Sequence, residues 1–114
     1  MPHIVIEYSQ NSLQFSDEKR MLKSAFEAVK LAGLFTLDNI KVRLHPVEQY
    51  QLALPDYGFI HVMCRMHIGK TSAQKQQLTQ HILDAISLLA EKKTVITVEV
   101  VEMARDSYAK RIVP

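Results

Sequence analysis

The strongest constraint on the fold is the order of two hydrophobic patterns along the 114 residues of the chain. Segments whose apolar residues alternate, as in strands, and segments whose apolar residues recur at helical spacing follow the order strand, helix, strand twice. Each half spans about fifty residues, a suitable length for one β-α-β unit. We predict a single α+β domain over residues 1–114, with halves at about 1–50 and 56–103 and a C-terminal arm at 104–114.

The first half begins with alternation over His3–Tyr8, which predicts a strand at the start of the chain. Ser16 precedes a stripe of apolar residues at helical spacing and can cap that helix. Gly33 follows the stripe, where a left-handed terminus is favoured. Alternation returns over Ile40–His45, so we expect a second strand there.

The second half follows a connector over Pro46–Asp56, whose last residues are typical of a turn. Alternation over Gly58–Ile68 predicts a third strand. Thr71 and Gln74 match the capping box of a second helix. Val95–Met103 is rich in β-branched residues and predicts a fourth strand. The arm after it has no clear period and suggests either a short extra strand or a segment that packs on a neighbour.

We expect these elements to form a four-stranded mixed sheet with two helices on one face. The other face then has no cover from the same chain, although it carries apolar side chains that are unfavourable in bulk water. These side chains are Val5, Phe59, Met63 and Val101. A partner subunit is the natural cover, so we expect a homo-oligomer.

Composition disfavours several classes of function. The formal net charge is only +2, and the longest basic cluster is Lys92–Lys93, so we expect no binding to nucleic acid. No apolar run approaches the roughly 20 residues of a membrane span. The apolar stretch that follows Met1 is too short for a signal segment, so we expect a cytoplasmic protein without membrane contact.

Neither a metal nor another cofactor is expected. The five histidines lack the spacing of a ligand cluster. Gly69-Lys70-Thr71 resembles the end of a phosphate-binding loop, but Cys64 occupies the position of the first glycine that such a loop requires. Cys64 is also the only cysteine, which excludes an intrachain disulfide, and its apolar strand face predicts a core residue.

Pro2 is the first candidate for chemistry. Removal of Met1 would leave proline with a free secondary amine, which is a good proton acceptor once it is neutral. Burial and nearby positive charge are the two effects that would lower its pKa enough for a base near pH 7. The alternative interpretation is that proline at this position is inert.

Three cationic side chains are candidates for binding an anionic substrate. Lys41 and Arg43 share the polar face of the second predicted strand, and they lie near Pro2 if that strand pairs with the first. Lys70 follows a glycine turn at the start of the second helix, where free N–H groups favour a carboxylate. The alternative is that all three are solvated surface charges.

Several short stretches, taken in order, resemble the 5-carboxymethyl-2-hydroxymuconate isomerase family of the tautomerase superfamily. The resemblance covers about nine-tenths of the chain. Its stretches are Met1-Pro2-His3 with the following Ile-Val-Ile-Glu, Gly33-Leu34-Phe35, residues 40–45, residues 56–61, Ile68-Gly69-Lys70 and residues 74–77.

The resemblance implies a homotrimer of β-α-β-β-α-β subunits with active sites near the subunit boundaries. It implies that the catalytic proline of the family is Pro2, and that Lys41 and Lys70 stand where the family has substrate-binding arginines, with Arg43 as a further basic residue. Lysine keeps the charge of arginine but lacks the fork that binds a carboxylate with two parallel hydrogen bonds.

These observations predict a cofactor-free isomerase that moves a proton between oxygen and carbon, or between two carbons, of an unsaturated carboxylate. Two alternatives remain. One is a ferredoxin-like ligand-binding module that forms a dimer, because the same order of strands and helices describes such modules. The other is a trimeric relative that keeps the fold without the activity.

Overall fold

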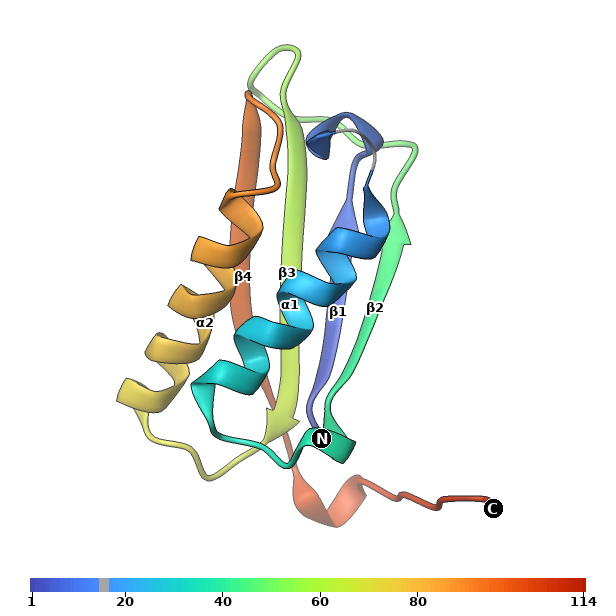
Figure 1. The fold of residues 1–114 in the computed structure, drawn as a ribbon, viewed down its shortest axis with the longest axis vertical. Helices are drawn as coiled ribbons and strands as arrows, with labels where there is room; N and C mark the ends of the chain where they lie inside the picture. Colours follow the sequence, from blue (N-terminus) through green and yellow to red (C-terminus); the bar gives the residue numbers. More distant parts are fainter. Residues whose placement is uncertain (15–16) are drawn as a thin grey trace.

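The computed structural model describes residues 1–14 and 17–114. Its strands are β1 (His3–Tyr8), β2 (Lys41–Pro46), β3 (Gly58–His67) and β4 (Thr94–Met103), and its helices are α1 (Glu18–Ala32) and α2 (Ser72–Ser87). The strands form one sheet in the order β2-β1-β3-β4 (Figure 1). β1 and β2 are parallel, as are β3 and β4, whereas the central pair β1 and β3 is antiparallel. The predicted mixed sheet of two β-α-β units is confirmed.

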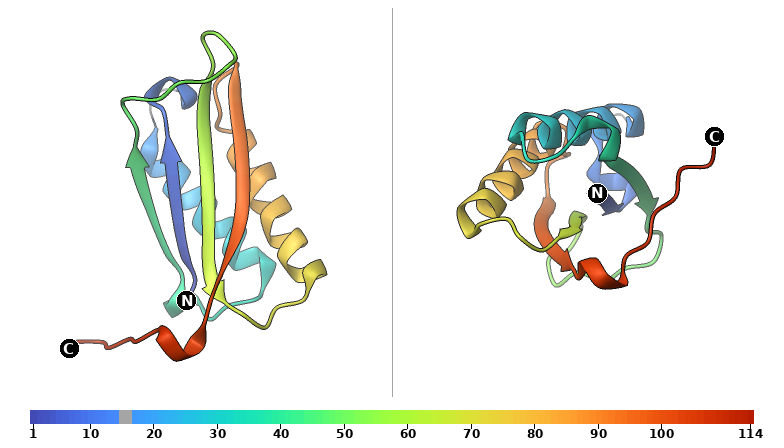
Figure 2. Two further views of the ribbon diagram at one scale, coloured as in Figure 1. Left: turned by 180° about the vertical axis from the view of Figure 1, so that it is seen from behind. Right: turned by 90° about the horizontal axis from the view of Figure 1, so that it is seen from below.

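Both helices cover the same face of the sheet, as predicted, and Figure 2 shows the opposite face open to view from behind. In the part of the chain that the structure describes, no helix is long and apolar enough to cross a membrane.

The ends of the helices follow from their sequences. At the start of α1, the Asp17 carboxylate accepts a hydrogen bond of 3.1 Å from the Arg20 backbone N–H, while the expected cap, Ser16, lies outside the described residues. Gly33 ends α1 with φ of 70°, a conformation that is inexpensive for glycine. At the start of α2, Thr71 and Gln74 exchange the two hydrogen bonds of the predicted capping box, at 2.9 and 3.1 Å.

The core lies between the helices and the sheet. Alternate residues of β1 and β3 point toward the helices, and the apolar stripes of α1 and α2 pack on them, as their periods predict. The main members are Ile4, Ile6, Tyr8, Ile60, Val62, Cys64 and Met66 from the strands, with Met21, Ala25, Val29, Leu78, Ile82 and Ile86 from the helices. Cys64 is fully buried, as predicted.

The C-terminal arm does not form the extra strand that was one of its two expected courses. After a 3-10 turn, η4 (Arg105–Ser107), it runs across the end of its own sheet, beneath the N-terminus (Figure 2). The physical reason is local contact: Tyr108 packs edge-on against His67 at a centroid distance of 4.9 Å, and the ammonium group of Lys110 donates to the Asn39 side chain at 3.0 Å.

Candidate active site

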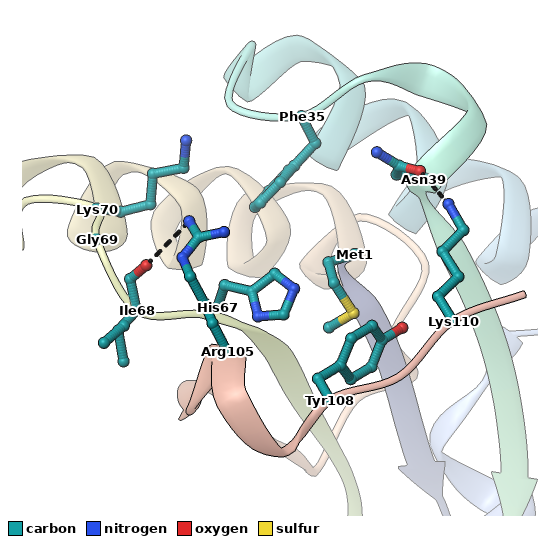
Figure 3. A pocket seen from close by; sticks show the side chains of 10 residues that line it. All are labelled: Met1, Phe35, Asn39, His67, Ile68, Gly69, Lys70, Arg105, Tyr108 and Lys110. Atoms are coloured by element: carbon teal, nitrogen blue, oxygen red, sulfur yellow. Dashed lines mark hydrogen bonds between the residues drawn. The ribbon is translucent and has the colours of Figure 1, made fainter.

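A pocket of about 430 Å³ opens at the end of the sheet where β1 and β2 begin and β3 and β4 end. Its wall comes from five parts of the chain: the N-terminus, the α1–β2 connection, the end of β3, the β3–α2 turn and the C-terminal arm. Three cations, Lys70, Arg105 and Lys110, line the pocket, and its described lining includes no acidic side chain. Figure 3 shows Lys70 and Arg105 on one side and Lys110 on the other. The charge of the pocket therefore suits an anion with more than one carboxylate.

Pro2 is held rigidly at the edge of this pocket. Its ring is fully buried, and its carbonyl oxygen accepts a hydrogen bond of 3.1 Å from the backbone N–H of Lys41, because β1 and β2 run in parallel. Met1, which is bonded to the Pro2 nitrogen, lines the pocket (Figure 3). Burial lowers the pKa of the terminal ammonium group of Met1, and the positive charges of Lys41 and Lys110 lower this pKa further.

Lys70 is placed in the pocket by the turn between β3 and α2. Gly69 has φ of 125°, a value that L side chains rarely adopt. The Lys70 ammonium nitrogen lies 5.7 Å from the centroid of the Phe35 ring, a separation at which a cation and an aromatic face attract. The first residues of α2 offer less to an anion than expected, because the N–H groups of Thr71 and Gln74 are engaged within the capping box. Lys70 is therefore the charged group that this rim offers to an anion.

Lys41 and Arg43 are not among the residues that line the pocket. Both lie on the sheet face opposite the helices, where Lys41 is in register with His3 and Arg43 with Val5. Lys41 donates from its ammonium group to the carbonyl oxygen of Asn39 at 3.2 Å. Arg43 lies 3.2 Å from Nδ1 of His3 through its guanidinium nitrogen Nη1. The first two strands do pair, which was the condition for Lys41 and Arg43 to lie near Pro2. The pairing brings both cations near the N-terminus without placing them in the pocket wall.

The C-terminal arm contributes residues to the pocket that no sequence pattern predicted. Arg105 donates to the carbonyl oxygen of Ile68 at 3.4 Å. Tyr108 has its hydroxyl oxygen 3.1 Å from Nε2 of His3. The available signal was compositional: a tyrosine and three basic residues occur among the last eleven residues, although they show no period.

Two other kinds of site, a metal site and a cysteine nucleophile, have little support in the structure. Among the described residues, no group of three or more His, Cys, Asp or Glu side chains is arranged to hold a metal ion. Burial raises the pKa of the Cys64 thiol to about 12, so this side chain is not a ready nucleophile.

A family model for 5-carboxymethyl-2-hydroxymuconate isomerase matches residues 2–112 of the chain. The 5-carboxymethyl-2-hydroxymuconate Delta-isomerase of Escherichia coli is 26% identical over 88 residues, which cover 75% of this chain and 70% of that protein.

Solved structures agree with the fold. A 5-carboxymethyl-2-hydroxymuconate isomerase from Deinococcus radiodurans has a TM-score of 0.80 at 20% identity, with 96% of this chain and 88% of that chain covered. A fused 4-OT, described as a symmetric trimer, has a TM-score of 0.79 at 13% identity, with 96% and 93% covered. Because the family model spans nearly the whole chain, the conclusion is direct: the chain is an isomerase that belongs to the 5-carboxymethyl-2-hydroxymuconate isomerase family.

Proposed function

We propose that the protein catalyses a cofactor-free 1,3-keto–enol shift on an unsaturated carboxylate such as 5-carboxymethyl-2-hydroxymuconate, with the Pro2 amine as base and then acid after removal of Met1. One observation carries the proposal. Met1, the residue bonded to the Pro2 nitrogen, lines a pocket with three cations. Without Met1, the amine of Pro2 would itself lie at the pocket wall.

The proton balance of the reaction is simple. The neutral amine of Pro2 takes a proton from the hydroxyl group or an acidic carbon of the substrate, and the electron pair left behind forms a dienolate. The resulting ammonium returns the proton to a different carbon, so the substrate is isomerised and the enzyme is restored. Positioned proton transfer of this kind typically contributes about 10²- to 10⁴-fold to a rate.

The surroundings of the N-terminus favour a neutral amine. Desolvation and the charges of Lys41 and Lys110 lower the pKa of the terminal amine of Met1. The same charges act on the amine of Pro2 once Met1 is absent, because the buried ring and the hydrogen bond to Lys41 keep Pro2 in place. A larger fraction of the base is therefore free of its proton near neutral pH.

The cations of the pocket suit the carboxylates of the substrate. The name 5-carboxymethyl-2-hydroxymuconate describes a dicarboxylate with one further carboxymethyl group, and Lys70, Arg105 and Lys110 line the pocket. Fixed cations also stabilise the oxyanion that develops in the dienolate. Lys41 contributes through its effect on the N-terminal amine, and a pocket of about 430 Å³ is within the range of small-ligand sites.

The test compares three preparations in a tautomerase assay with 5-carboxymethyl-2-hydroxymuconate. These are the processed enzyme, a Pro2→Ala variant, and enzyme that retains Met1 because the methionine aminopeptidase was inhibited during expression. We expect Pro2→Ala to lower kcat about 10²- to 10⁴-fold, and retained Met1 to abolish turnover because the Pro2 nitrogen is then an amide and no longer a base. Intact mass spectrometry establishes the N-terminus of each preparation.

Pro55→Ala is the matched control, because Pro55 is an exposed turn residue far along the chain from the site. It should keep the full rate. A full rate in Pro2→Ala or in the Met1-bearing enzyme would end the proposal. Binding of 5-carboxymethyl-2-hydroxymuconate without turnover by the processed enzyme would favour the non-catalytic relative instead.

We also propose that the protein is a homotrimer. Val5, Phe59, Met63 and Val101 lie on the sheet face without helices, and the fused 4-OT relative is described as a symmetric trimer. Native mass spectrometry should give three chains per particle, whereas a dimer would favour the ferredoxin-like alternative.

A further inference from the structure

The structure contains a chain of side-chain contacts that leads from the open face of the sheet into the pocket. Arg43 Nη1 lies 3.2 Å from His3 Nδ1, and His3 Nε2 lies 3.1 Å from the Tyr108 hydroxyl oxygen. Tyr108 lines the pocket. These three residues come from β2, β1 and the C-terminal arm, so the contacts connect segments that are far apart in the sequence.

The chemistry of the partners sets the direction of each hydrogen bond. A guanidinium group has donors and no acceptor, so Arg43 must donate to Nδ1 of His3. A histidine that accepts at Nδ1 carries its proton at Nε2, and it therefore donates to the oxygen of Tyr108. The Tyr108 hydroxyl then accepts from His3, which leaves its own hydrogen to be donated to another group.

The Tyr108 ring is also fixed by its neighbours. His67 lies edge-on to it at 4.9 Å with an interplanar angle of 89°, and His3 is at 6.2 Å and 66°. Edge-to-face rings at these separations attract each other. These contacts, with the hydrogen bond to His3, hold the Tyr108 side chain at a defined place in the pocket wall.

We infer that Tyr108 is a further catalytic residue, which donates a hydrogen bond to the substrate oxygen on which the dienolate charge develops, and that His3 and Arg43 are positioning residues which orient its hydroxyl. The inference rests on the proposed keto–enol reaction, because only that reaction builds up charge on an oxygen in this pocket. A donor aimed at such an oxygen stabilises the transition state more than the ground state.

The first experiment is Tyr108→Phe, which removes the hydroxyl and keeps the ring between its two imidazole neighbours. We expect kcat on 5-carboxymethyl-2-hydroxymuconate to fall about 10²-fold with KM nearly unchanged, because the lost interaction belongs to the transition state. Tyr50→Phe is the matched control, since the Tyr50 hydroxyl also bonds a side chain, that of Asn11, at 3.3 Å. It should keep the full rate. A full rate in Tyr108→Phe would overturn the inference.

The second experiment separates positioning from a merely structural role of His3. His3→Gln places an amide donor near the former Nε2 and keeps the bond to Tyr108, whereas His3→Asn reaches only the former Nδ1 and loses that bond. We expect His3→Gln to keep most of the rate and His3→Asn to lose most of what Tyr108→Phe loses. In the Tyr108→Phe background, His3→Asn should cost almost nothing more. Equal losses in the two His3 variants, or additive losses in the double variant, would overturn the positioning role.

Comparison with Pro2→Ala keeps this inference distinct from the proposed function. A large loss in Pro2→Ala with a full rate in Tyr108→Phe would remove the tyrosine and leave the proline mechanism intact. A full rate in Pro2→Ala with a large loss in Tyr108→Phe would remove proline as the base and leave the tyrosine as a catalytic residue.

Discussion

The two ends of the sheet differ in how they are filled: one is closed by hydrogen bonds between segments, and the other carries the pocket. At the end away from the pocket, the backbone N–H of Ser9 donates to Phe59 O at 3.0 Å, and the Ser9 hydroxyl accepts from the Phe59 N–H at 3.0 Å. The N–H of Glu91 donates to Ser12 O at 2.8 Å, which ties the segment after α2 to the segment after β1. The other end is hollow and lined by cations.

The difference shows how a small domain can remain stable although one end carries a cluster of like charges. Like charges that face one cavity repel one another, and they contribute little to the stability of the fold. The opposite end compensates with satisfied backbone groups and close packing, where each hydrogen bond contributes about 1 kcal/mol. Substitutions at the closed end should therefore change stability, and substitutions at the pocket end should change activity.

The largest change in stability is expected from Gly58→Ala at the closed end. A Cβ atom on Gly58 would lie 2.5 Å from the side-chain oxygen of Asn11 and 2.6 Å from the hydroxyl oxygen of Ser9. The Asn11 side chain is exposed and can move, but Ser9 is buried and hydrogen-bonded. We expect the free energy of unfolding to fall by about 1–3 kcal/mol, measured by urea denaturation, with the rate per folded molecule unchanged.

A double variant sharpens this prediction. Asn11→Ala added to Gly58→Ala removes one of the two clashes, so it should recover part of the lost stability. An unchanged denaturation midpoint in Gly58→Ala, or a lowered kcat with full stability, would contradict the division between the two ends.

An intermediate effect is expected from Lys70→Ala at the pocket end. Loss of a cation that meets a substrate carboxylate should raise KM about tenfold, which corresponds to about 1.4 kcal/mol of binding free energy. The free energy of unfolding should be nearly unchanged. Among the aromatic rings that the structure describes, Lys70 contacts only that of Phe35, with its ammonium nitrogen 5.7 Å from the ring centroid. Lys92→Ala is the control, since Lys92 is exposed at the closed end. Equal KM values for the two variants would show that Lys70 does not bind the substrate.

The smallest effect is expected on the pH dependence of Lys110→Gln. The positive charge of Lys110 lowers the pKa of the Met1 amine; we expect the same charge to lower the pKa of the Pro2 amine in the processed enzyme, so its removal should raise that pKa. The base is active when neutral, and kcat/KM therefore falls as the pH falls through its pKa. In a plot of kcat/KM against pH, the decrease on the acidic side should move to higher pH in Lys110→Gln and stay in place in Lys92→Gln. A decrease that moves to lower pH in Lys110→Gln would contradict the assignment of the Pro2 amine as the base.

The local pattern was sufficient to predict most of the fold. Alternation in β1 and β3, the left-handed Gly33 and the capping box of Thr71 and Gln74 are short-range features, and the structure confirms each of them. The strand bounds differ by one residue at both ends of β2 (Lys41–Pro46), at the end of β3 (His67) and at the start of β4 (Thr94), because hydrogen bonding to the neighbouring strand rather than alternation decides where a strand starts and ends.

The candidate site was only partly predictable, because three of its ten lining residues, Arg105, Tyr108 and Lys110, come from a segment without a period. The Tyr108 hydroxyl meets the His3 ring across 105 positions of sequence, and no local pattern signals such a contact. Arg43 illustrates the same limit. Its strand, its face and its closeness to the N-terminus follow from the pairing of β1 with β2, but the side chain contacts His3 rather than the pocket.

The wall of Tyr108 and Lys110 beside Met1 also bears on how the molecule matures. A ribosome delivers the first residues of a chain long before these two, so a nascent polypeptide has no enclosure around its initiator methionine. Trimming by an aminopeptidase therefore has the whole period of synthesis in which to act on an accessible end. Once Tyr108 and Lys110 have emerged, they form part of the wall beside the terminus, and a methionine that escaped trimming until then is only partly exposed.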